Sequence, residues 1–195
     1  MATTRKHDNE TARWLARRYC EFGDARALQD DLAGAIANYE RAAELDRDSA
    51  RAQLSLGDSY LLAERDDDAY AAYLRAVTRH PHSAEAHFCL ADVLARDGRL
   101  AEAIGELELA VACAPERPYY CYRLAELYMR AGDDEMAETA LMAAIALDPD
   151  EGLYRYKLGE LHFRAGEWLL AAQAYLRATQ CAPLDDFYHV RLASA

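Results

Sequence analysis

Clusters of histidine and of carboxylate side chains are the parts of this sequence that could perform chemistry. Three histidines lie within one short stretch: His80, His82 and His87. His82 and His87 flank a predicted turn and helix start, which is poor geometry for two ligands of one metal ion. Three consecutive aspartates occupy residues 66–68, and acids at the start of a helix are explained by their favourable interaction with the helix dipole. We therefore expect neither cluster to bind a metal ion.

Sequence motifs of known enzyme classes are missing from the chain. We find no glycine-rich nucleotide loop, nucleophile elbow or HExxH sequence. The five cysteines are odd in number, widely spaced and without a CxxC pair, which argues against a disulfide framework or a zinc ribbon. The sequence therefore predicts a protein that is not an enzyme and that needs no cofactor.

Composition narrows the class of partner and the cellular compartment. Among 195 residues, 34 are acidic and 22 are Lys or Arg, which gives a formal net charge of -12. A field of that sign repels the phosphates of nucleic acids, so we expect no nucleic-acid partner. The chain has no apolar run of about 18 residues, and residues 1–10 lack the apolar core of a signal peptide. We therefore predict a cytoplasmic protein without a membrane span.

Prolines at a regular spacing reveal how the chain is organised. Four of the five prolines follow one another at intervals of 34 residues: Pro81, Pro115, Pro149 and Pro183. A fixed period of this length is typical of repeat proteins. When each proline is placed at position 32 of a repeat, the chain divides into five blocks: 16–49, 50–83, 84–117, 118–151 and 152–185.

Each block has the pattern of two helices joined by a turn. Apolar residues recur at helical spacing on both sides of position 15, which is Gly98, Gly132 or Gly166 in the last three blocks. Glycine ends helices readily, and proline cannot continue them. Positions 20 and 27 of every block are alanine, and these small residues share one helix face that can pack closely against another helix. The sequence therefore predicts an all-α solenoid of five hairpins.

The two ends of the chain depart from the repeat. Residues 1–15 are predicted to be an N-terminal extension that starts the first helix early. The basic character of residues 1–20, together with Trp14, suits either a lengthened cap or a membrane-surface anchor, and we favour the cap. Residues 186–195 restart the pattern as a partial sixth repeat or a C-terminal capping helix. A poorly covered end would offer a face for a homo-oligomer.

The repeat resembles the tetratricopeptide repeat, a 34-residue helix-turn-helix unit. The resemblance covers residues 16–185 and rests on positions 7, 8, 20, 24, 27 and 32. The first block departs most, because Arg26 occupies the usual aromatic position 11 and Arg47 replaces the proline. His162 occupies position 11 of the fifth block, where we expect a half-buried histidine with a hydrogen-bond partner. The resemblance implies a right-handed superhelix whose first helices line a concave groove.

The resemblance also implies that positions 2, 5, 6, 9, 12 and 13 of each first helix face this groove. In repeats three to five these positions supply the candidate peptide-binding residues: Phe88, Asp92, Arg96, Tyr119, Tyr122, Arg123, Glu126, Arg130, Tyr156, Lys157, Glu160 and Arg164. Position 5 is aromatic in all three repeats, which would suit rigid anchors for a peptide. Packing of these rings between neighbouring helices is an alternative of equal weight.

Charge changes along the groove positions. Position 9 is acidic in every repeat and, taken alone, predicts a basic ligand. Position 13 is arginine in repeats three to five, one helical turn after the acid, so we expect pairs such as Glu126 with Arg130. Position 6 adds Arg123 and Lys157. We therefore predict that the acidic or C-terminal part of a peptide lies near Arg123, Arg130, Lys157 and Arg164.

These features predict a non-enzymatic scaffold or adaptor that binds a peptide or a partner protein in the groove. Two alternatives remain open at this point. The chain could be a self-associating structural solenoid, or it could be a regulatory piece of a larger enzyme. A fold of this kind does not by itself choose among them.

Overall fold

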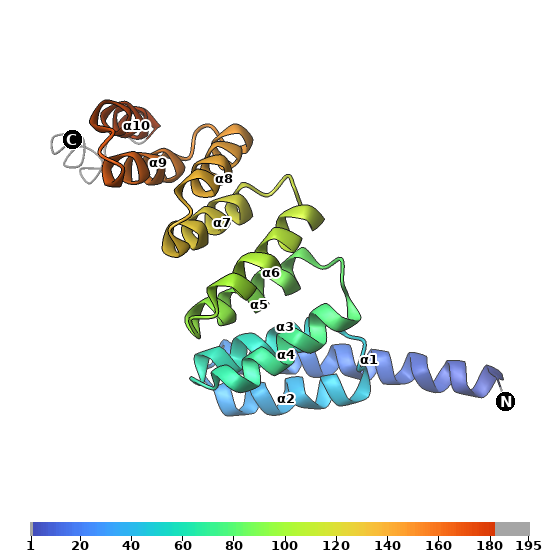
Figure 1. Cartoon of the computed structure of the whole chain (residues 1–195). Helices are drawn as coiled ribbons and strands as arrows, with labels where there is room; N and C mark the ends of the chain where they lie inside the picture. The colour runs from blue at the N-terminus through green and yellow to red at the C-terminus, as the bar shows by residue number, and fades with distance from the viewer. Residues whose placement is uncertain (1, 182–195) are drawn as a thin grey trace. The chain divides into compact units, whose positions relative to one another are not determined.

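The computed structural model describes residues 2–181, with side chains from residue 9 onward, and this part of the chain contains ten α-helices and no strand. In chain order (Figure 1) the helices are α1 (Ala2–Ala27), α2 (Leu32–Leu45), α3 (Ala50–Leu62), α4 (Asp66–Arg79), α5 (Ala84–Arg96), α6 (Leu100–Cys113), α7 (Pro118–Ala131), α8 (Asp134–Leu147), α9 (Gly152–Arg164) and α10 (Trp168–Cys181). They follow one another as helix-turn-helix pairs, and ten helices fit five repeats. The predicted all-α fold is therefore confirmed.

The helices belong to two compact units. The first unit is Met1–Asp97 and contains α1 to α5, and the second is Gly98–Ala195 and contains α6 to α10. The boundary falls in the turn of the third repeat, so the two helices of that repeat belong to different units. The repeat pattern did not predict this division. The predicted partial sixth repeat at 186–195 lies outside the described residues.

Several helices begin at a side chain that accepts a backbone hydrogen bond. Ser49 caps α3 and Ser83 caps α5 at equivalent positions of consecutive repeats, and Asp31 and Asp133 cap the second helices α2 and α8. The first N–H groups of a helix have no partner within the helix, so these side chains fix where it begins. The aspartates 66–68 form the first turn of α4, in agreement with their predicted role at a helix start.

The turn at position 15 has the same left-handed backbone in all five repeats. Gly98, Gly132 and Gly166 have φ angles of +80°, +81° and +77°. Asp30 and Glu64 occupy this position in the first two repeats, with φ angles of 58° and 57°. Such a conformation costs a residue with a Cβ atom roughly 1 kcal/mol, whereas glycine adopts it freely. The predicted role of the three glycines as helix terminators is confirmed.

Alanine forms the tightly packed interior of the hairpins. All ten alanines at positions 20 and 27 are fully buried: Ala35, Ala42, Ala69, Ala76, Ala103, Ala110, Ala137, Ala144, Ala171 and Ala178. The larger residue at position 24 is also buried in each repeat, as Tyr39, Tyr73, Leu107, Leu141 or Tyr175. A methyl side chain lets two helices approach closely while the larger residue fills the space between them.

The residue at position 24 determines which residue fits at position 8. Repeats one, two and five combine tyrosine at position 24 with glycine at position 8, whereas repeats three and four combine leucine with alanine. A Cβ atom added to Gly23 would lie 2.5 Å from the ring of Tyr39, and one added to Gly159 would lie 2.5 Å from the ring of Tyr175. Close-packed interiors do not tolerate such contacts, so the tyrosine ring requires a glycine opposite it.

Candidate peptide-binding site

The acid at position 9 is bound by the tyrosine at position 24 in the three repeats that have a tyrosine there. In repeats one, two and five its carboxylate accepts a hydrogen bond from the tyrosine hydroxyl at position 24. The distances are 2.8 Å from Tyr39 to Asp24, 2.5 Å from Tyr73 to Asp58, and 2.7 Å from Tyr175 to Glu160. These three acids stabilise their own hairpins. This corrects the interpretation of the acidic ladder, taken alone, as a surface for a basic ligand.

Burial and the neighbouring carboxylates keep Tyr39 and Tyr73 protonated. Loss of solvent, followed by the hydrogen bond to the acid, raises the pKa of Tyr39 and of Tyr73. The hydroxyl therefore remains a hydrogen-bond donor throughout the neutral pH range. Asp24 accepts the hydrogen bond from the Tyr39 hydroxyl, and its second carboxylate oxygen pairs with Arg51 of the next repeat at 2.5 Å.

Two of the arginines at position 13, Arg96 and Arg164, bind acids of the preceding repeat. Nη2 of Arg164 lies 2.8 Å from Oδ1 of Asp134, and Nη2 of Arg96 lies 3.7 Å from Oδ1 of Asp66. Both acids belong to the first turn of the second helix in the preceding repeat. These ion pairs connect consecutive repeats, whereas the sequence analysis had considered only pairs within one helix.

Four cationic side chains and one carboxylate line a pocket formed by α7 and α9, which we call the basic pocket. It has a volume of about 410 Å³ and is lined by Arg123, Glu126, Leu127, Met129, Arg130, Lys157 and Arg164. Five of the predicted site residues therefore surround a single pocket. Leu127 and Met129 add apolar surface to it. The basic pocket lies entirely within the second unit.

Glu126 organises the charges of the basic pocket. Its carboxylate lies 3.0 Å from Nζ of Lys157 and 3.3 Å from Nε of Arg123. The same carboxylate accepts a hydrogen bond of 2.7 Å from the hydroxyl of Tyr122. Arg130 and Arg164 add two further positive charges to the lining, so positive charge is in excess. An anionic ligand would compete with Glu126 for Lys157 and Arg123.

The aromatic residues at position 5 of α7 and α9 are packed between helices. Tyr122 and Tyr156 are only 8% and 6% exposed. The ring of Tyr122 lies 5.4 Å from that of Tyr154, and the ring of Tyr156 lies 5.8 Å from that of Tyr175. Of the two alternatives for these rings, the structure therefore shows packing. Burial, followed by the hydrogen bond to Glu126, raises the pKa of Tyr122, which stays a donor.

Tyr119 is the aromatic candidate with the most accessible ring. It is 46% exposed, and its hydroxyl accepts a hydrogen bond of 3.1 Å from Nη1 of Arg123. The guanidinium carbon of Arg123 also lies 5.9 Å from the centre of the Tyr119 ring. Tyr119 therefore joins an exposed aromatic surface to one side chain of the basic pocket.

Three predicted site residues lie apart from the basic pocket in the chain. Phe88, Asp92 and Arg96 belong to α5 and so to the first unit. Phe88 and Asp92 are half-buried, and Arg96 is exposed and pairs with Asp66. A role for these three residues in peptide binding stays a prediction.

Family comparison settles which repeat the chain contains. The family model described as tetratricopeptide repeat matches residues 67–118 and 122–186, and a model described as TPR repeat matches residues 23–63. The chain is a tetratricopeptide repeat protein. Tetratricopeptide repeats are generally protein–protein interaction modules.

Solved structures share the fold of this tetratricopeptide repeat protein over most of its length. MamA from Desulfovibrio magneticus RS-1 is 20% identical with a TM-score of 0.79, over 88% of this chain and 97% of that one. YrrB, described as a TPR protein with an unusual peptide-binding site, is 20% identical with a TM-score of 0.76, over 91% of each chain. PilF from Pseudomonas aeruginosa is 19% identical with a TM-score of 0.77, over 95% of this chain and 85% of that one. At these identities the likeness concerns the fold. No curated protein matches the sequence significantly.

Residues 9–181 of the tetratricopeptide repeat protein show no sign of metal chemistry. No group of three His, Cys, Asp or Glu side chains in this range is placed to hold a metal ion. His162 is 8% exposed and its Nδ1 lies 2.7 Å from Oε2 of Glu167, as expected for a packed histidine with a partner. None of the helices described is long and apolar enough to cross a membrane.

Sequence reasoning missed two features of this site. Leu127 lines the basic pocket, although its position in the repeat is not among the expected groove positions. The tyrosine partners of the position 9 acids were also missed. A signal for them was present, because glycine at position 8 accompanies tyrosine at position 24 in the same three repeats.

Proposed function

We propose that this tetratricopeptide repeat protein is a non-enzymatic cytoplasmic scaffold or adaptor that binds an acidic peptide segment of a partner protein in the basic pocket. The observation that carries the proposal is the lining of four cationic side chains and one carboxylate, in a chain whose net charge is -12. Most of the chain repels anions, so a concentration of cations at one pocket favours a specific acidic ligand.

The chemistry of the lining suits a carboxylate. A guanidinium group such as that of Arg123 or Arg130 can donate two parallel hydrogen bonds to a carboxylate, and Lys157 supplies a point charge. Arg164 already pairs with Asp134, so a ligand would share it with that acid. Leu127 and Met129 offer apolar contact for the neighbouring part of a peptide. Tyr119, exposed beside Arg123, would contact a residue further along the peptide.

Similarity to YrrB supports the peptide part of the proposal. That protein is described as having a peptide-binding site, and it shares the fold of this chain. The acidic character of the ligand is inferred from the residues of this chain alone.

Fluorescence anisotropy with two short labelled peptides tests the proposal. One peptide has acidic residues at a free C-terminus, and its matched copy has glutamine and asparagine in their place and an amidated C-terminus. We expect the wild type to prefer the acidic peptide. Replacing Arg130→Gln and Lys157→Gln together should weaken its binding at least about tenfold, because a single charged hydrogen bond already contributes about 1.5 to 3 kcal/mol.

Arg117→Gln provides the matched control. This exposed residue precedes α7 and does not line the basic pocket. Its replacement removes one positive charge, as does each of the two replacements in the pocket variant. Affinity should stay within about twofold of the wild type. Equal binding of the two peptides, or equal loss in the control and the pocket variant, would contradict the proposal.

Self-association is the second candidate function, and exposed apolar residues of α10 support it. Trp168 and Leu169 are 55% and 73% exposed on the last helix described. A second copy of the chain would cover this surface. Sedimentation at rising concentration should show a monomer-to-dimer transition that Leu169→Glu abolishes. A constant monomer mass would reject this candidate without affecting the peptide proposal.

A further inference from the structure

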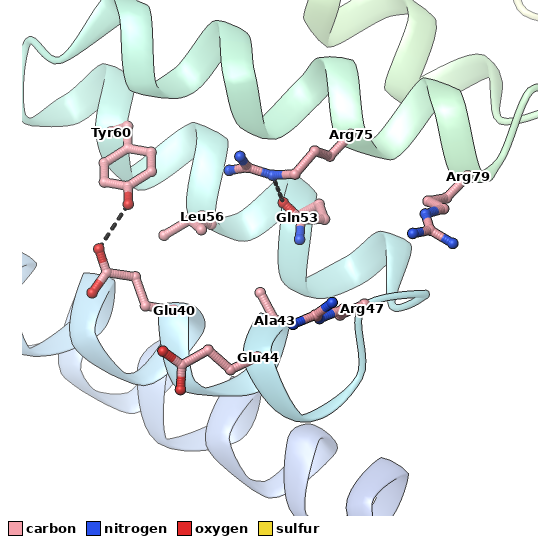
Figure 2. A pocket seen from close by; sticks show the side chains of 9 residues that line it. All are labelled: Glu40, Ala43, Glu44, Arg47, Gln53, Leu56, Tyr60, Arg75 and Arg79. Atoms are coloured by element: carbon pink, nitrogen blue, oxygen red, sulfur yellow. Dashed lines mark hydrogen bonds between the residues drawn. The ribbon is translucent and has the colours of Figure 1, made fainter. Parts of the chain in front are cut away.

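A second cation-lined pocket lies in the first unit, between the second helices of repeats one and two and the helix that joins them. It has a volume of about 510 Å³ and is formed by residues of α2, α3 and α4 and by Arg47, which follows α2. Figure 2 shows Tyr60 and Glu40 facing each other at one end and Arg79 at the opposite end. We call it the arginine pocket after Arg47, Arg75 and Arg79. It shares no residue with the basic pocket.

The carboxylates of the arginine pocket already have partners. Glu40 accepts a hydrogen bond of 2.8 Å from the hydroxyl of Tyr60, and Glu44 pairs with Arg41 at 2.6 Å. Burial, followed by the hydrogen bond to Glu40, raises the pKa of Tyr60 to about 12, so this donor is protonated at neutral pH. The two acids are therefore engaged within the protein.

The guanidinium groups keep unused donors. Nε of Arg75 donates a hydrogen bond of 3.1 Å to Oε1 of Gln53, a side chain that is only 6% exposed (Figure 2). This neutral partner orients the guanidinium but does not cancel its charge. Arg79 pairs with Asp48 at 3.1 Å, and Arg47 forms no ion pair with any described residue. Two of the three cations are thus not neutralised by a carboxylate within hydrogen-bonding distance.

The fold does not require this set of residues. An equivalent pocket between repeats four and five, of about 260 Å³, shares six repeat positions with the arginine pocket. There Glu40 is replaced by Met142 and Ala43 by Ile145. Arg75 is matched by Arg177, whereas Arg47 and Arg79 correspond to Pro149 and Cys181. Arg47 is at position 32 of repeat one, and Arg75 and Arg79 are at positions 26 and 30 of repeat two. Among the five repeats, arginine occupies these three positions together only where repeats one and two meet. Since hairpins of the same kind pack without arginine at positions 30 and 32 elsewhere, packing does not require Arg47 and Arg79.

We propose that the arginine pocket binds a small molecule that carries a carboxylate or phosphate group. Planar guanidinium groups recognise both anions through paired hydrogen bonds, and the buried Gln53 holds one of them in place. Ala43 and Leu56 give the pocket an apolar wall for the rest of the molecule, and its volume lies in the range of small-molecule sites. The site is independent of the peptide proposed for the basic pocket.

Nuclear magnetic resonance titration of the full chain tests this site with two probes, inorganic phosphate and succinate. The arginine Nε–Hε signals report directly on guanidinium contacts. We expect at least one probe to give saturable shifts with a Kd of about 1 mM or below, as suits a ligand of few atoms. Saturation by phosphate alone or by succinate alone identifies the anion that the site prefers.

Matched variants locate the binding. Arg47→Gln with Arg75→Gln should weaken it about tenfold, and Arg47→Gln alone, at an exposed residue without an ion pair, about threefold. Arg51→Gln removes the same charge from α3, outside the pocket, and should change the Kd less than about twofold. Absence of saturation up to about 10 mM of either probe, or equal weakening in all variants, would overturn the proposal.

Discussion

Repeats four and five place an acid at the same position and use it differently. Glu160 of repeat five accepts a hydrogen bond of 2.7 Å from the hydroxyl of Tyr175, within its own hairpin. Repeat four has Leu141 in place of that tyrosine, and its acid, Glu126, lies beside Lys157 and Arg123 in the basic pocket. The buried residue at position 24 therefore decides whether the acid supports the hairpin or shares in a surface that can meet a ligand.

The same comparison explains the small residue at position 8. Repeat five needs Gly159 because the ring of Tyr175 occupies the space of a Cβ atom, whereas repeat four has Ala125 beside a shorter leucine. Two pairs of residues thus build the same hairpin: glycine with tyrosine in repeat five, and alanine with leucine in repeat four. Substitutions that combine a residue of one pair with a residue of the other should separate the effects on packing from those on binding.

The largest effect should come from Gly159→Ala. The added methyl group would meet the Tyr175 ring at 2.5 Å and force it to move, so we expect a loss of about 2 to 3 kcal/mol in the free energy of unfolding. Urea unfolding followed by circular dichroism measures this. Gly105→Ala is the matched control, because nothing lies within 4 Å of its new Cβ atom, and it should stabilise the protein by about 0.5 to 1 kcal/mol. Equal stability of the two variants would show that the ring does not constrain position 8.

A compensating change should recover much of that loss. Gly159→Ala combined with Tyr175→Leu converts repeat five to the pair that repeat four contains. We expect the double variant to be more stable than the sum of the single losses predicts, by about 1 kcal/mol or more. Additive losses would mean that the glycine and the tyrosine act independently.

Tyr175→Phe should have a smaller effect. It keeps the ring and removes only the hydrogen bond to Glu160, so we expect a loss of about 1 kcal/mol in the free energy of unfolding. Tyr119→Phe, at an exposed tyrosine, should cost less than about 0.5 kcal/mol by the same urea measurement. A similar loss in both would argue against a special role of the buried hydroxyl.

The sequence alone predicted the helix pairs because their signals are local and repeated. Proline at position 32, glycine at position 15 and alanine at positions 20 and 27 each restrict the backbone or the packing in the same way in successive repeats. The cations of the basic pocket were also predicted, since Arg130 and Lys157 occupy fixed positions on first helices. Sequence reasoning succeeded where one position could be interpreted by itself.

Features that depend on a second helix could not be predicted in this way. The burial of Tyr122 and Tyr156 depends on Tyr154 and Tyr175, which occupy other positions or other helices. The arginine pocket likewise combines side chains from three helices. In the sequence, Arg47 was recognised only as a departure of the first repeat from the proline at position 32. The division of the chain between α5 and α6 has no signal in the periodic positions.

A modest gain in affinity for an acidic peptide is predicted from Glu126→Gln. Removing this carboxylate frees Lys157 and Arg123 from a competing ion pair, so binding should tighten about threefold. Glu160→Gln, at the same position of repeat five, should change the peptide Kd by less than about twofold. The anisotropy assay measures both. A stronger gain from Glu160→Gln than from Glu126→Gln would contradict the proposal that Glu126 lies in the binding site and that Glu160 stabilises its own hairpin.

Reversal of charge in the basic pocket tests the central claim most directly. Arg130→Glu with Lys157→Glu would turn two of its cations into anions, and binding is then compared for an acidic peptide and for its copy with lysine at the acidic positions. We predict that the wild type prefers the acidic peptide and that the variant prefers the basic one, with both proteins giving the same circular dichroism spectrum. An unchanged preference for the acidic peptide in a folded variant would contradict the claim that the basic pocket recognises the partner.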